Sequence, residues 1–131
     1  MREIKFRAWD KTAETMYENV NIQAYRGYGG YNISSEGIFV GVNCERFILM
    51  QYTGLKDKNG QEIYEGDIVK GKVRFQGTVI GVKGQVIYNH CRFVIGEYNC
   101  ELYQFSNNFD GRGTWIEVIG NKYENPELLE G

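Results

Sequence analysis

The sequence contains little proline, histidine or cysteine, and it has no long apolar run. Its 131 residues include one Pro, one His and three Cys. With a single imidazole available, acid–base chemistry would fall to carboxylates. An odd number of cysteines favours reduced thiols and a cytoplasmic location over a disulfide framework. No stretch approaches the roughly 18 apolar residues of a membrane helix, so we expect no membrane partner.

The N-terminal segment and the total charge argue against two further classes of protein. Residues 1–11, MREIKFRAWDK, alternate charged and apolar side chains and lack an apolar core, so we expect no signal peptide. The formal net charge is −2. The chain as a whole therefore lacks the basic excess that is typical of nucleic-acid-binding domains.

The remaining composition is that of a globular chain with many turns. Apolar residues make up 42% of the sequence and aromatic residues 15%, which suffices for a hydrophobic core without disulfides. Ten tyrosines suit half-buried sheet faces, where the ring packs and the hydroxyl stays in water. Seventeen glycines indicate frequent turns.

The N-terminal half predicts a β-hairpin followed by an irregular segment. Residues 4–8, IKFRA, alternate apolar and basic side chains, as half-buried strands do, and a second short strand is predicted over 16–22. Residues 24–46 are rich in Gly, Ser and Asn and predict a long loop or irregular hairpin. The apolar run 47–54 predicts a strand buried on both faces. We expect residues 1–52 to form an N-terminal region packed on the rest of the chain.

Residues 53–67, TGLKDKNGQEIYEGD, combine four carboxylates, two lysines and three glycines. Asp57–Gly60 has the sequence of a type I turn followed by a bulge, with Gly60 at positive φ. Leu55 and Ile63 flank this turn and are expected to pack together. A second turn is predicted at Glu65–Asp67, with Asp67 as its cap.

The second half predicts short strands and very little helix. Residues 68–75, IVKGKVRF, alternate apolar and basic side chains, and Gly or Asn separates the β-rich runs that follow, at 77–82, 84–89, 92–96, 101–105 and 114–121. Asn125 and Pro126 begin a predicted C-terminal helical turn, with Asn125 as its N-cap. The sequence therefore predicts an all-β chain in which residues 53–131 form a small barrel or roll.

Three longer motifs resemble the YopX family of bacteriophage and prophage proteins. They are MREIKFRAWD at 1–10, LMQYTGLKDKNGQEIYEGDIV at 49–69 and WIEVIGNKYENPELLE at 115–130. The resemblance implies a phage or prophage origin in a bacterial host. It also implies a small β-rich fold with an SH3-like barrel element over 53–131. It provides no catalytic residue to assign.

A calcium loop beginning at Asp57 fits the sequence poorly. The Asp57-x-Asn59 spacing matches the start of an EF-hand loop, which needs Gly at its sixth position and Glu at its twelfth. Those positions hold Glu62 and Ile68. We therefore interpret the segment as a capped turn and predict no bound metal.

The other candidate sites also favour a structural interpretation. Cys44, Cys91 and Cys100 are far apart and include no C-x-x-C pair, and the single His90 adjoins Cys91, so their side chains would diverge in a strand. The acidic cluster of Glu62, Glu65 and Asp67 lies in a turn-rich segment that we expect to be wet. The sequence predicts no enzyme and no cofactor.

Charge is unevenly distributed along the chain. Residues 68–96 contain five Lys or Arg and no acid, whereas residues 97–131 contain seven acids and two basic residues. Because alternate residues of a strand share a face, Lys70, Lys72 and Arg74 are predicted to form a basic stripe.

Two interpretations of this stripe remain open. With Lys5 and Arg7 it could form an electrostatic footprint for nucleic acid, assisted by tyrosine stacking. Alternatively, the lysines protect an edge strand from sheet-to-sheet aggregation. We therefore expect a non-enzymatic interaction or structural module that contacts a host or phage protein or a second copy of itself, with nucleic-acid binding as the alternative.

Overall fold

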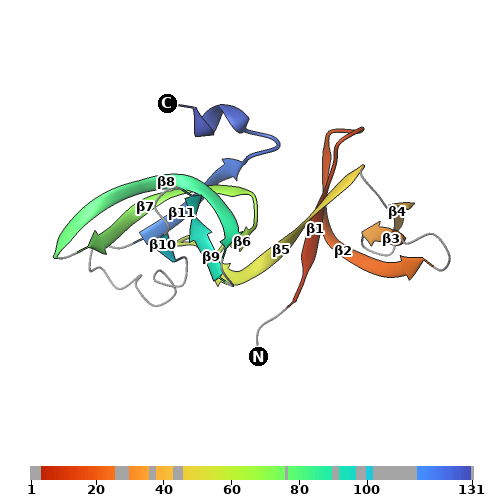
Figure 1. The fold of residues 1–131 in the computed structure, drawn as a ribbon, viewed down its shortest axis with the longest axis horizontal. Coiled ribbons are helices and arrows are strands. Elements are labelled where there is room, and N and C mark those ends of the chain that lie inside the picture. Colours follow the sequence, from red (N-terminus) through yellow and green to blue (C-terminus); the bar gives the residue numbers. More distant parts are fainter. Residues whose placement is uncertain are drawn as a thin grey trace. The chain divides into compact units, whose positions relative to one another are not determined.

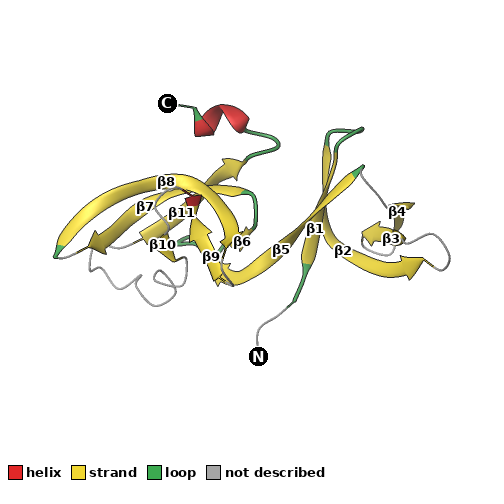
Figure 2. Ribbon diagram, viewed as in Figure 1, coloured by secondary structure: helices red, strands yellow, loops and turns green. Residues whose placement is uncertain are grey.

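The computed structural model describes residues 4–25, 30–35, 38–42, 46–75, 77–89, 92–96, 100–101 and 115–130. The chain consists of two compact units, Met1–Tyr52 and Thr53–Gly131. Each unit is built from antiparallel strands, which confirms the predicted all-β class (Figure 2). No helix in the described ranges has the length and apolar character needed to cross a bilayer.

The first unit is a sheet with strand order β4-β3-β2-β1-β5 (Figure 1). Its strands are β1 (Phe6–Asp10), β2 (Thr15–Tyr25), β3 (Gly30–Ser35), β4 (Ile38–Val42) and β5 (Phe47–Lys56), the last of which continues into the second unit. The β1–β2 pair confirms the predicted hairpin. Residues 24–46 contain a second, irregular hairpin of β3 and β4, which was one of the two alternatives expected there.

The core of the first unit is small. Ala8, Val20 and Phe47 are buried, and Leu49 is one of the half-buried side chains that pack against them. Both faces of β5 carry buried residues, as predicted, with Phe47 and Thr53 on one face and Met50 and Tyr52 on the other. Arg7 is only 6% exposed, which departs from the expected alternation of buried apolar and exposed basic residues.

The second unit contains a sheet with strand order β10-β9-β8-β7-β11, and β6 neighbours β5. Its elements are β6 (Glu62–Tyr64), β7 (Asp67–Phe75), β8 (Thr78–Asn89), β9 (Arg92–Ile95), β10 (Cys100–Glu101), β11 (Trp115–Asn121) and the 3₁₀ helix η3 (Pro126–Leu129). Two runs that were expected to be separate strands form the single strand β8, because Gly84 pairs with Val69 inside the ladder. Of the predicted run 101–105, only Glu101 lies within the described residues.

Alternate residues of β7 form the centre of the second core. Val69 and Val73 pack with Val82 from β8 and Ile116 from β11. Ile63 belongs to the same cluster, and Leu55 packs against that cluster. The two side chains that flank the turn therefore share one core.

Both predicted turns are present. The Gly60 N–H donates to the Asp57 carbonyl at 3.0 Å, and Gly60 has φ +83°, a value that glycine adopts without strain. In the second turn Gly66 has φ +85°. The buried Asp67 accepts a hydrogen bond from the Tyr64 N–H at 2.8 Å. Two of the four carboxylates of residues 53–67, Asp57 and Asp67, are therefore turn caps.

The C-terminal helical turn is present, and the predicted N-cap residue is confirmed in its position but not in its side-chain bond. Asn125 occupies the N-cap position of η3 without a side-chain capping bond. Its Oδ1 accepts instead from the Asn121 N–H at 3.2 Å. The side chain therefore ties the helix to the end of β11, and Leu128 N–H bonds the Asn125 carbonyl.

Candidate interaction surface

The predicted basic stripe lies on the exposed face of β7. Because β7 pairs with β8 on one side and β11 on the other, the interpretation of these lysines as protection of an edge strand is wrong. Lys70 and Lys72 are exposed, whereas Val69, Gly71 and Val73 between and beside them are buried. Arg74 follows in register on the same strand, but its side chain is outside the described residues.

Neighbouring strands widen this stripe into a surface. Lys70 lies opposite Lys83 of β8 on one side and opposite Glu117 of β11 on the other. Lys72 lies opposite Trp115 of β11. Residues directly opposite in an antiparallel ladder project from the same face, so these five side chains share one side of the sheet.

The turn before β6 adds one more cation. Lys58 Nζ lies 3.5 Å from Glu117 Oε2 and 4.3 Å from the centroid of the Trp115 ring. We call the combined surface the lysine face. It comprises Lys58, Lys70, Lys72, Lys83, Trp115 and Glu117.

The charges on the lysine face do not balance. Four ammonium groups surround a single carboxylate, and Glu117 is already paired with Lys58. Lys70 and Lys83 stand directly opposite each other, an arrangement of like charges that destabilises a sheet. Within the described part of the chain, neither of them has an ion-pair partner. An anion placed between them would relieve this repulsion.

The sequence indicated the lysines of β7 at the centre of this surface, but not Lys58 and Trp115 at its edge. Lys58 and Trp115 are far apart in the chain, and only the pairing of β11 with β7 and the docking of the turn on β11 bring them together. Lys5 and Arg7, which the nucleic-acid interpretation included, belong to the first unit. Arg7 is buried there, and Lys5 Nζ lies 5.1 Å from the Tyr52 ring centroid.

The calcium interpretation of Asp57 is excluded by its hydrogen bonds. Oδ1 accepts from the N–H groups of Asn59 and Gln61, and Oδ2 accepts from the Val118 N–H, all at 2.8 to 2.9 Å. These donors face the positions that a cation would need. Across the residues that the structure describes, no group of three His, Cys, Asp or Glu is arranged to hold a metal ion.

The structure describes only some of the remaining sequence candidates. Glu62 and Glu65 are half-buried residues that make contacts of their own, and the buried Asp67 caps its turn. The expectation that this acidic cluster is wet is therefore wrong. Cys44, His90 and Cys91 lie outside the described residues, as does the side chain of Cys100.

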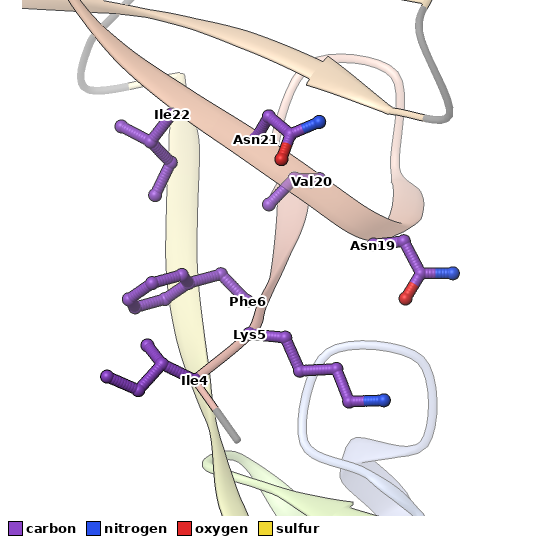
Figure 3. A pocket seen from close by; sticks show the side chains of 7 residues that line it. All are labelled: Ile4, Lys5, Phe6, Asn19, Val20, Asn21 and Ile22. Atoms are coloured by element: carbon purple, nitrogen blue, oxygen red, sulfur yellow. The ribbon is translucent and has the colours of Figure 1, made fainter. Parts of the chain in front are cut away.

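The first unit has an open groove of about 420 Å³ between β2 and the start of β1. Figure 3 shows Ile4, Phe6 and Ile22 on one side of the strands and Lys5 and Asn19 on the other. Ile4 is 69% exposed. The lining has no carboxylate, imidazole or thiol, and it combines apolar side chains with the two amides Asn19 and Asn21 and the ammonium group of Lys5.

Comparisons with known proteins place the chain in a family. A sequence profile of the YopX protein family matches residues 5–130, so the chain belongs to the YopX family. The crystal structure of protein EF1440 from Enterococcus faecalis is similar, with 31% sequence identity and a TM-score of 0.72. The similarity covers 99% of this chain and 100% of that one. A search of curated proteins gave no match.

Proposed function

We propose that this protein is a non-enzymatic binding module and that the lysine face is its contact surface for an anionic partner. The single observation that carries the proposal is the unbalanced Lys70–Lys83 pair at the centre of that face. A sheet surface that only needed solubility would gain from alternating charges, whereas a surface that binds an anion gains from clustered cations.

The arrangement of the acidic groups supports a non-enzymatic function. Among the described residues of the second unit, Asp57 and Asp67 are the buried carboxylates, and both accept backbone N–H bonds within turns. A carboxylate engaged in this way holds the chain in place and is not presented to a substrate.

The cellular setting and barrel architecture belong to the same proposal. Membership of the YopX family supports a phage or prophage origin and action in the cytoplasm of a bacterial host. The sheet β10-β9-β8-β7-β11, with the Asp57 turn docked on β11, supports an SH3-like barrel element. The sequence left a host or phage protein, a second copy of the chain and nucleic acid open as partners. The lysine face favours an anionic partner among these.

The test is salt-dependent binding to polyanions. The wild-type protein should bind heparin and DNA at about 50 mM salt and lose at least tenfold in affinity at about 200 mM. The triple variant K70Q/K72Q/K83Q should lose most of this binding and its salt dependence. Lys11 is exposed in a turn of the first unit, so K11Q is the control for the loss of one cation outside the lysine face. An absence of binding at low salt, or a triple variant that binds like K11Q, would overturn the proposal.

A further inference from the structure

We propose that the anionic partner is single-stranded nucleic acid, and that Trp115 is the platform on which one of its bases stacks. This inference rests on the proposed function and specifies the partner's chemistry. Its starting point is the juxtaposition of an aromatic ring and a cation row. Trp115 lies directly opposite Lys72 and on the same side of the sheet as Lys70 and Lys83.

The geometry of the face suits an extended strand. Lys70 and Lys72 are two residues apart on β7, which separates them by roughly 7 Å along the strand. Lys83 extends the row sideways by one strand. Between Lys83 and Val79, Gly81 is exposed and has no side chain, so the surface beside Lys72 is flat and open. A nucleic-acid backbone can therefore lie across the lysines with its bases toward β11.

Trp115 is half-buried and carries a cation on its ring. The Lys58 ammonium belongs to an exposed turn, and its contacts among the described residues are with the ring and with Glu117. A cation–π contact at an exposed site contributes about two- to fivefold in an equilibrium. Base–aromatic stacking contributes about 5- to 150-fold per base. A base can therefore displace Lys58 from Trp115.

The displaced Lys58 then becomes available to a phosphate. Its contact with Glu117 is 3.5 Å long and half-exposed, and pairs of this kind contribute little. Lys58 thus covers the ring in the free protein and adds a phosphate contact in the complex. An acidic protein partner would use the same lysines but would have no base to place on the ring. This difference makes the inference testable apart from anion binding.

The experiment is a titration of the full-length protein with oligothymidine, oligouridine and duplex DNA of equal length, followed by tryptophan fluorescence. Trp9 and Trp115 are the two tryptophans of the chain. Single strands should quench the wild-type signal and bind at least fivefold tighter than duplex. In W115L, which retains only the buried Trp9, quenching should disappear and affinity for single strands should fall about 5- to 150-fold.

Two further variants separate stacking from folding and from charge. W115F keeps an aromatic ring and should retain most of the affinity, which excludes a general loss of structure as the cause in W115L. K58Q should reduce the steepness with which the log of the binding constant falls against log salt by about 0.7, the loss expected for one phosphate contact on a single strand. K11Q should leave both measurements unchanged.

The two proposals fail in different ways. If heparin and duplex DNA bind with the expected salt dependence, but W115L binds single strands like the wild type, the stacking inference is overturned and the anionic contact surface stands. Equal affinity for single strands and duplex would overturn the inference as well. If no polyanion binds at low salt, both proposals fall together.

Discussion

The Asp57 carboxylate reaches Val118, sixty-one residues further along the chain, and its Oδ2 accepts the Val118 N–H at 2.9 Å. The neighbouring Lys58 N–H donates to the Ile116 carbonyl at 2.9 Å. The turn at 57–60 is therefore attached to β11, the last strand of its sheet. One side chain thus caps a local turn and joins two segments that are distant in sequence.

Replacement of the Asp57 carboxylate should destabilise the folded protein. Asp57→Ala leaves the N–H groups of Asn59, Gln61 and Val118 without their acceptor, so we expect the free energy of unfolding to fall by about 3 kcal/mol. Urea denaturation followed by circular dichroism measures this loss. Asn59→Ala is the control, since only the backbone of Asn59 bonds Asp57, and it should change stability by about 0.5 kcal/mol or less. Equal stabilities of the two variants would contradict the role given to Asp57.

Asp10 should make the first unit sensitive to acid. The Arg46 guanidinium donates to both carboxylate oxygens at 2.8 Å, and these bonds, with the N–H bonds of Ala13 and Thr12, lower the pKa of Asp10 from 3.8 to about 2, although burial opposes the shift. Because the folded pKa is depressed, the carboxylate stabilises the folded state fully above the unfolded pKa. This contribution is lost as the pH falls through about 4 to 2.

The measurement is the free energy of unfolding as a function of pH for the wild type and Asp10→Asn. The amide cannot titrate and cannot accept both guanidinium bonds. The wild type should therefore be the more stable protein at neutral pH, and the gap should narrow below pH about 4. Parallel curves over that range would show that the Asp10–Arg46 pair does not create the acid sensitivity.

Gly71 should be essential for the pairing of β7 with β11. A Cβ atom at Gly71 would overlap the Trp115 carbonyl oxygen and crowd the Ile116 Cα. Both obstacles are backbone atoms and cannot move aside, so Gly71→Ala should cost about 3 kcal/mol of stability. Gly81→Ala provides the control, because that position on β8 is exposed and has its nearest neighbour at 4.0 Å. Thermal unfolding of both variants compares them, and similar melting temperatures would refute the steric argument.

Much of this fold is determined by local patterns and was predictable for that reason. The turn at Asp57–Gly60 needs a glycine at positive φ and an acceptor at its first position, and both are visible in four consecutive residues. The alternation of apolar and basic residues in β7 determines which face of the strand is buried and which is exposed. These features require no knowledge of distant partners.

The features that could not be predicted depend on non-local pairing. β3 consists of Gly, Tyr, Asn, Ile and Ser, and it is a strand because β2 pairs with it along its whole length. The burial of Arg7 and the meeting of Lys58 with Trp115 also depend on tertiary contacts. Spacing along the chain gives no sign of them, so the sequence indicated the cation row without its aromatic neighbour.

The attachment of the 57–60 turn to β11 has a consequence for how molecules of this protein behave toward each other. A terminal strand presents backbone donors and acceptors that can template the addition of another chain. Here the Ile116 carbonyl and the Val118 N–H are already occupied from within the molecule. The turn therefore blocks the addition of another chain at β11 and opposes fibril-like growth. A molecule in which the turn is detached would expose an edge that promotes aggregation.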